Sequence, residues 1–204
     1  MGRPRVAVVG AGGIGGFLGA LLVRGGADAV LVARGPHLTA MQECGLTLES
    51  QLFGTWNVTP RVTDDVRALG RVDVVLFCVK TYDLAAAAHQ CRALVGPDTA
   101  VIPVQNGIEV ADHLGAILGT EHILGGLTYV AGRLVAPGHV RQQGLSRALV
   151  FGELEGGSSP RTRELAAFLQ EHGVAADLRE DMQRLLWEKF VVICATGGVL
   201  AVTR

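Results

Sequence analysis

A glycine-rich segment near the N-terminus constrains the fold of this chain more than any other feature. Residues 6–9 are an apolar run rich in valine, residues 10–15 read Gly-Ala-Gly-Gly-Ile-Gly, and large apolar residues then recur at helical spacing up to Gly25. This order predicts a buried strand, a tight loop and a helix, the opening unit of a dinucleotide-binding βαβ fold. In such a unit Gly10 allows the turn, Gly12 lets the backbone approach a pyrophosphate, and Gly15 allows close packing of helix and strand.

The same segment carries no charge from Val6 to Val23, as a signal peptide or a short membrane span would. Six of these eighteen residues are glycine. Each glycine inside a helix costs about 0.5–1 kcal/mol relative to alanine, so one continuous apolar helix is unfavourable here. We therefore interpret the segment as a buried strand and helix, and we expect no membrane partner.

The composition narrows the class of protein further. The chain has 204 residues, of which 49% are hydrophobic and 18% are charged, so it can bury a sizeable core. Its 18 Lys and Arg residues against 19 Asp and Glu residues leave no basic excess for binding nucleic acid. No CxxC pair occurs among its four cysteines, Cys44, Cys78, Cys91 and Cys194. We interpret them as small apolar core residues of a cytoplasmic protein without a metal site.

Strand-like and helix-like segments alternate along most of the chain. Further strands are predicted at residues 29–33, 72–79, 100–104, 123–129 and 175–178, and helices at 36–43, 84–95, 109–118 and 160–172. Residues 46–49 and 55–63 have the pattern of a β-hairpin, and residues 133–152 have that of a β-meander. The alternation predicts an α/β fold with a Rossmann-type, doubly wound and mainly parallel sheet over residues 1–180.

Residues 181–204 are too few to form a domain of their own. Asp181 is a suitable N-cap, and apolar residues follow it at helical spacing as far as Gly197 and Gly198, where we expect the helix to break. We interpret this segment as the first helix of an all-helical C-terminal domain that is truncated here.

Polar residues at the ends of the predicted strands indicate the kind of coenzyme. Arg34 follows the second strand, where an NAD-binding site usually has Asp or Glu for the ribose hydroxyls. A guanidinium there suits a 2′-phosphate, so NADP is favoured over NAD. Lys80 ends the longest strand at the carboxyl edge, where ligands bind in open α/β sheets. Asn106, in the Gln-Asn-Gly sequence of residues 105–107, ends the next strand and suits a nicotinamide ribose or a substrate.

Taken in order, these motifs resemble the ketopantoate reductases (2-dehydropantoate 2-reductases). The resemblance covers essentially the whole chain and rests on the glycine loop, Arg34, Val-Lys at 79–80, Val-Gln-Asn-Gly at 104–107 and Leu-Trp-Glu-Lys at 186–189. It implies a Rossmann domain that binds NADPH, a helical C-terminal domain, and an active site in the cleft between them. The implied reaction reduces 2-dehydropantoate to (R)-pantoate on the route to pantothenate and coenzyme A, and a homodimer is a possible assembly.

The resemblance also implies roles for individual residues. The pyrophosphate would be held by Gly10, Ala11, Gly12, Gly13, Ile14 and Gly15, and the 2′-phosphate by Arg34 and Lys80. Asn106 would contact both cofactor and substrate, and Ala131 would touch the cofactor through its backbone.

Lys189 would be the proton donor in this scheme. Its neighbours on the helix face, Leu185 and Ile193, are apolar, and desolvation lowers the pKa of an ammonium group toward the range that suits a general acid. The same lysine would polarise the substrate carbonyl as negative charge builds on its oxygen.

Two features depart from the family pattern. Ile193 and Gly197 stand where asparagines usually grip the substrate hydroxyl and carboxylate, which makes a related 2-oxo acid an alternative substrate. The chain also ends at Arg204, before the residues that complete the helical domain, so an NADP-binding paralogue without turnover is a second alternative. A related two-domain dehydrogenase of hydroxy or imino acids is a third. A methyltransferase shares the glycine loop but not the later motifs.

Overall fold

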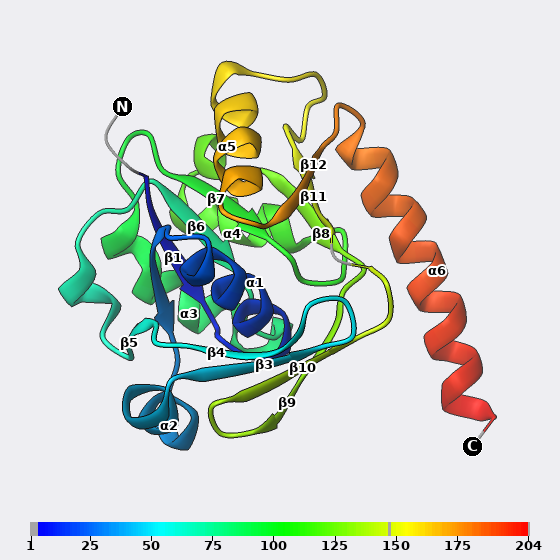
Figure 1. Ribbon diagram of the computed structural model, residues 1–204. Helices are drawn as coiled ribbons and strands as arrows, with labels where there is room; N and C mark the ends of the chain where they lie inside the picture. Colours follow the sequence, from blue (N-terminus) through cyan, green and yellow to red (C-terminus); the bar gives the residue numbers. More distant parts are fainter. Residues whose placement is uncertain (1–3, 147, 204) are drawn as a thin grey trace.

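Five parallel strands form the central sheet of the computed structural model, which describes residues 4–146 and 148–203 (Figure 1). Their order is β5-β2-β1-β6-β7. They span Arg61–Thr63 (β5), Asp28–Val32 (β2), Arg5–Val9 (β1), Val74–Phe77 (β6) and Ala100–Pro103 (β7). The chain runs from β1 outward to β2 and β5, and then returns to place β6 and β7 on the other side of β1. The sheet is therefore doubly wound, as predicted, with its topological switch point between β1 and β6.

Each face of this sheet is covered by its own hydrophobic core, and the apolar side chains of β1 alternate between the two cores. Val6 and Val8 pack in one core with residues of α1 (Gly13–Arg24) and α5 (Pro160–Glu171). Ala7 and Val9 pack in the other core with residues of α3 (Leu84–Cys91) and α4 (Val110–Leu118). The uncharged N-terminal segment is thus a buried strand and helix, which confirms its interpretation from the sequence.

A second sheet lies against α1 and contains the predicted hairpin. β3 (Leu46–Ser50) pairs antiparallel with β4 (Gly54–Val58), but the hairpin does not extend to residue 63 as expected. The strand ends before Pro60, which has no N–H to donate, and residues 61–63 form β5 of the central sheet, parallel to β2. Between β2 and β3 lies α2 (Gly35–Cys44).

The predicted meander is only partly correct. β9 (Ala131–Ala136) and β10 (His139–Gln143) do form an antiparallel pair, but β10 also pairs in parallel with β3. β11 (Ala148–Gly152) instead joins a third sheet between β8 (Gly125–Thr128) and β12 (Ala175–Leu178). This third sheet is linked to β7 by a parallel bridge between Val101 and Ile123. Pairing partners so distant in sequence leave no local signal.

The last helix, α6 (Met182–Val202), runs along one side of the molecule (Figure 1). It continues through Gly197 and Gly198, so the expected break is absent within the described residues. Asp181 does not cap it through its side chain as expected, because that carboxylate pairs with Arg184 and Arg179. By length and apolar composition alone, α6 is the one described helix that is long enough to cross a membrane. A separate domain beginning at residue 181 stays a prediction.

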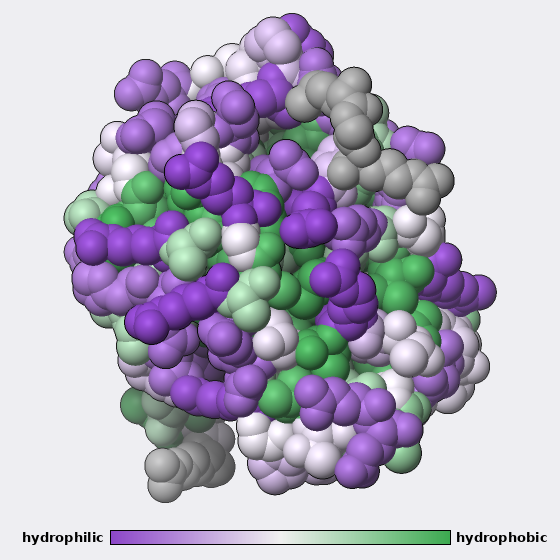
Figure 2. Space-filling view, turned by 90° about the vertical axis from the view of Figure 1, so that its left-hand side faces the viewer, coloured by the Kyte–Doolittle hydropathy of each residue, from purple (hydrophilic) through white to green (hydrophobic). Residues whose placement is uncertain are grey.

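The surface and the cysteines add two details. On the side of the molecule that Figure 2 shows, hydrophilic side chains surround smaller hydrophobic areas, as is usual for a protein surface. Cys91 is buried as expected of a core residue, whereas Cys44 and Cys194 are exposed, so the interpretation of all four cysteines as core residues was wrong.

Candidate functional site

The predicted coenzyme residues meet at the carboxyl edge of the central sheet. Gly10 follows β1, Arg34 follows β2, Lys80 follows β6, and Asn106 follows β7. Because these four strands are parallel and adjacent, the loops after them lie along one edge. This edge, at the switch point, is where open α/β sheets bind their ligands.

The glycine loop has the geometry that close approach of a ligand requires. Gly10 has a φ of +94°, and a Cβ placed there would lie 2.8 Å from the backbone nitrogen of Val79. A Cβ at Gly15 would lie 2.1 Å from the carbonyl oxygen of Gly10, so only glycine lets α1 pack this closely on the loop. In contrast, a Cβ at Gly12 would meet no described atom within 4 Å. The space in front of Gly12 is therefore open to a ligand.

The hydrogen bonds of the loop decide which amides can bind an anion. The N–H groups of Gly10 and Ala11 both donate to the carbonyl oxygen of Val32, at 3.1 Å each. These two residues shape the turn, and their amides are already used. The first amides of a helix have no partner within it, so the donors left for a pyrophosphate begin at Gly12 and continue through Gly13 and Ile14.

A buried histidine that the sequence analysis did not identify holds this loop in place. His37 of α2 is 9% exposed, and its Nε2 lies 2.8 Å from the carbonyl oxygen of Ala11. Its Nδ1 accepts the N–H of Gly138 at 2.9 Å, so the ring is the neutral tautomer that donates from Nε2 to Ala11. Since a peptide unit is planar and trans, fixing the Ala11 carbonyl also fixes the opposite direction for the Gly12 N–H.

Two cations flank the opening beside the glycine loop. Arg34 is the residue before α2, and its side chain is 81% exposed. Its Nη2 donates to Oδ2 of Asp83 at 2.8 Å, across from β2 to the 3₁₀ turn that follows β6. Lys80 is exposed at the start of that turn and makes no ion pair with a described residue. Open space before the amides of the loop, with exposed cations nearby, fits a phosphorylated dinucleotide.

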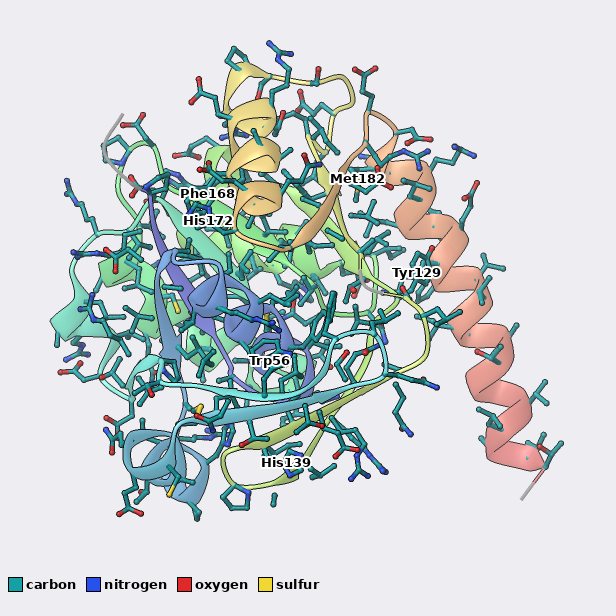
Figure 3. The ribbon with its side chains drawn as sticks, viewed as in Figure 1. Trp56, Tyr129, His139, Phe168, His172 and Met182 are labelled. Atoms are coloured by element: carbon teal, nitrogen blue, oxygen red, sulfur yellow. The ribbon has the colours of Figure 1, made fainter. Side chains whose placement is uncertain are left out.

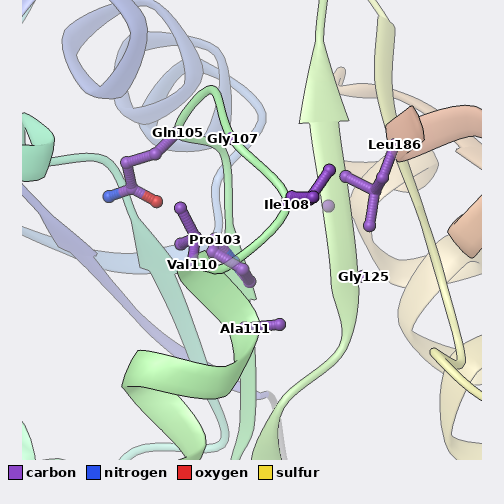
Figure 4. A pocket seen from close by; sticks show the side chains of 9 residues that line it. Pro103, Gln105, Gly107, Ile108, Val110, Ala111, Gly125 and Leu186 are labelled. Carbon is purple, nitrogen blue, oxygen red and sulfur yellow. The ribbon is translucent and has the colours of Figure 1, made fainter. Parts of the chain in front are cut away.

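Asn106 lies exposed in the loop between β7 and α4. Its neighbour Gln105 fixes this loop to the end of β6, because Nε2 of Gln105 donates to the carbonyl oxygen of Val79 at 2.8 Å. The loop borders a pocket that β8 and α6 complete, in which Ile108 and Leu186 point toward each other (Figure 4). The loop of Asn106 therefore faces the part of α6 that precedes Lys189.

Lys189 is one of two buried residues of α6, with 7% of its surface exposed. Its Nζ donates to the carbonyl oxygen of Thr128 at 2.7 Å and lies 5.4 Å from the ring centroid of Tyr129, which stands beside α6 (Figure 3). Burial lowers the pKa of Lys189 from 10.5 to about 8. The pKa of Lys189 is therefore lowered by desolvation, as expected from the sequence. The end of β8 covers this lysine together with the apolar residues of its own helix.

The remaining predicted residues take positions with less definite consequences. Ala131 is exposed at the start of β9, while the adjacent Gly132 packs on the glycine loop: a Cβ at Gly13 would lie 2.2 Å from the Gly132 carbonyl oxygen. Ile193 is half-buried, and a Cβ at Gly197 would meet open space.

In the described part of the chain, no three His, Cys, Asp or Glu side chains gather in a group able to hold a metal ion.

Comparison with known proteins agrees with this geometry. The family model of ketopantoate reductase PanE/ApbA matches residues 6–156. A 2-dehydropantoate 2-reductase of Mesorhizobium japonicum is 32% identical over 97% of this chain and 68% of its own length. The crystal structure of 2-dehydropantoate 2-reductase from Porphyromonas gingivalis W83 superposes with a TM-score of 0.91, at 28% identity, over 98% of this chain and 72% of its own.

A more distant structure shares the fold. The ternary structure of D-mandelate dehydrogenase with NADH and anilino(oxo)acetate has a TM-score of 0.84 at 23% identity, over 93% of this chain and 61% of its own. This chain spans 61–64% of the length of seven further curated relatives. The family match and the relative that is 32% identical confirm the resemblance found in the sequence. The chain belongs to the ketopantoate reductase family.

Proposed function

We propose that this chain provides the coenzyme site and the proton donor of an NADPH-dependent reductase of 2-oxo acids, with 2-dehydropantoate as the leading substrate. The observation that carries the proposal is the buried side chain of Lys189, on the helix that faces the loop of Asn106. Burial lowers the pKa of this lysine to about 8. A lysine poised near neutral pH is what proton donation to a ketone oxygen requires.

The chain's own residues would hold the coenzyme at three places. The amides of Gly12, Gly13 and Ile14 would bind the pyrophosphate at the N-terminus of α1. Arg34, which follows β2, and Lys80, which follows β6, would hold the 2′-phosphate from the two sides of β1. Asn106, which follows β7, would contact the nicotinamide ribose. When bound, the coenzyme supplies the hydride for the carbonyl carbon.

Lys189 would complete the reduction at the carbonyl oxygen. Its ammonium group is oriented by the Thr128 carbonyl, which accepts one of its three protons and leaves two for other acceptors. One of these would stabilise the negative charge that develops on the ketone oxygen and would then pass to it. The low exposure of Lys189 strengthens this interaction, because little water competes for the proton.

The residues around the substrate leave a related 2-oxo acid as the second candidate. Ile193 and Gly197 offer no side-chain amide on the same helix, so a substrate hydroxyl would lose a partner that the family pattern usually provides. A 2-oxo acid with an apolar side chain suits Ile193 better than one with a hydroxyl group.

The test is a panel of 2-oxo acids assayed by NADPH oxidation, with wild type and Lys189→Ala compared. We expect 2-dehydropantoate to give the highest kcat/KM, and Lys189→Ala to lower kcat by about 10²- to 10⁴-fold. The NADPH Kd of the variant should stay within about threefold, since the lysine acts on the substrate. An unchanged kcat would refute the role of Lys189. Tight NADPH binding without oxidation by any 2-oxo acid would instead identify a paralogue without turnover.

A further inference from the structure

The ion pair between Arg34 and Asp83 joins the two walls of the proposed coenzyme site. Arg34 follows β2, whereas Asp83 closes the 3₁₀ turn Thr81–Asp83 that begins after Lys80. Nη2 of Arg34 and Oδ2 of Asp83 are 2.8 Å apart, and the Asp83 side chain is 33% exposed. A carboxylate is thus already paired with one nitrogen of the guanidinium that would bind a 2′-phosphate.

Asp83 also lies at the N-terminus of α3. It is the N-cap residue of α3, and aspartate is among the residues that best cap a helix by accepting its first N–H groups. Its side chain makes no such cap hydrogen bond, because its carboxylate turns to Arg34 instead. The N–H of Leu84, the first residue of α3, already donates to the carbonyl oxygen of Thr81. A carboxylate released from Arg34 would therefore be stabilised there by the helix dipole and not by a cap hydrogen bond.

We propose that Asp83 is the counter-ion that a 2′-phosphate displaces from Arg34, and that it thereby sets how strongly the site prefers NADPH over NADH. This inference rests on the proposed NADPH site. A phosphate group carries up to two negative charges and three acceptor oxygens, so it competes successfully with one carboxylate for the guanidinium. The displaced Asp83 carboxylate stays beside the N-terminus of α3, where the helix dipole favours negative charge. NADPH exchanges the carboxylate for the phosphate at Arg34, because two anions on one guanidinium repel each other, whereas NADH leaves the pair intact.

The size of the effect follows from the exposure of the pair. Ion pairs at the protein surface change equilibrium constants by about fivefold at most, because water and salt screen them. Asp83→Asn removes the charge and keeps the size and shape of the side chain. We expect this variant to bind NADPH about two- to fivefold more tightly than wild type, and to bind NADH within about 1.5-fold of wild type.

The experiment is calorimetric titration of NADPH and NADH into wild type, Asp83→Asn, Arg34→Ala and the double variant. In the Arg34→Ala background, Asp83→Asn should no longer change NADPH affinity, because the pair is already absent. Asp64→Asn is the matched control: it removes an exposed carboxylate from the same sheet edge, after β5, and should leave both affinities within about 1.5-fold. Melting temperatures of all variants verify that each is folded.

Three outcomes overturn the inference. They are that Asp83→Asn leaves NADPH affinity unchanged, weakens it, or tightens it equally in the Arg34→Ala background. The last result would mean that Asp83 repels the phosphate without pairing with Arg34. In each case wild type still binds NADPH, so the proposed site survives. If wild type binds no NADPH at all, the proposed function itself is wrong and the role of Asp83 falls with it.

Discussion

Because burial lowers the pKa of Lys189, we expect the free energy of unfolding to depend on pH in a way that can be measured without any assay of catalysis. The folded protein holds this pKa at about 8, whereas the unfolded chain has the ordinary value of 10.5. Between these values the unfolded chain binds more protons, so the contribution of Lys189 to the free energy of unfolding rises as the pH rises. At about 1.4 kcal/mol per pKa unit, the whole contribution is about 3 kcal/mol. About 2 kcal/mol of it falls between pH 7 and pH 9.5.

Lys189→Met removes the titrating group and keeps an unbranched apolar side chain. Urea unfolding of wild type and variant at several pH values from 7 to 9.5 gives two free energies of unfolding at each pH. Loss of the hydrogen bond to Thr128 shifts the difference between them by a constant amount. The pH-dependent part isolates Lys189, since changes from other groups, such as the buried thiol of Cys91, occur in both proteins and cancel.

We expect wild type to gain about 2 kcal/mol relative to Lys189→Met over this pH range. The chain has only two lysines, and the other, Lys80, is exposed, so Lys80→Met is a matched control. Its difference from wild type should stay constant within about 0.5 kcal/mol. A difference between wild type and Lys189→Met that changes by less than about 0.5 kcal/mol would refute the account of a desolvated lysine.

Three further predictions concern the loop and the reaction. Gly12→Ala should change the free energy of unfolding by no more than about 1 kcal/mol in urea, because its Cβ enters open space. The same variant should bind NADPH at least about tenfold more weakly in calorimetry. Unchanged affinity would show that the loop does not face the coenzyme. His37→Ala should lose about 1–3 kcal/mol in urea unfolding, because Ala11 and Gly138 lose a buried partner, and a smaller loss would contradict the role of the ring. In steady-state assays kcat should fall as the pH rises through about 8, where Lys189 loses its proton; a kcat that increases there would be inconsistent with proton donation.

The sequence predicted the parts of the site that follow from strand order. Once residues 6–9 and 72–79 were identified as strands of one parallel sheet, Gly10 and Lys80 had to lie at the same edge. The structure places them there and shows that the two strands are neighbours. The buried βα unit was predictable because a valine run followed by a glycine loop favours a strand and a tight turn over a continuous helix. The roles of these residues toward a ligand stay predictions.

The parts that the sequence did not predict depend on contacts between distant segments. His37 reads as an ordinary helical residue until Gly138, a hundred and one positions later, is placed against its ring. The partner of Arg34 is Asp83, 49 residues later in the chain, and no local sequence pattern links the two. The burial of Lys189 follows from the Thr128 carbonyl and the Tyr129 ring, and an apolar helix face accounts for only part of it.

We propose that the edge of the sheet beside the glycine loop binds a dinucleotide and recognises its 2′-phosphate. Calorimetric titration of the chain with adenosine 2′,5′-bisphosphate and with adenosine 5′-monophosphate tests this directly, because the two ligands differ only in the phosphate that Arg34 and Lys80 would hold. We expect the bisphosphate to bind at least about tenfold more tightly than the monophosphate. Equal affinities, or binding of neither ligand, would contradict it.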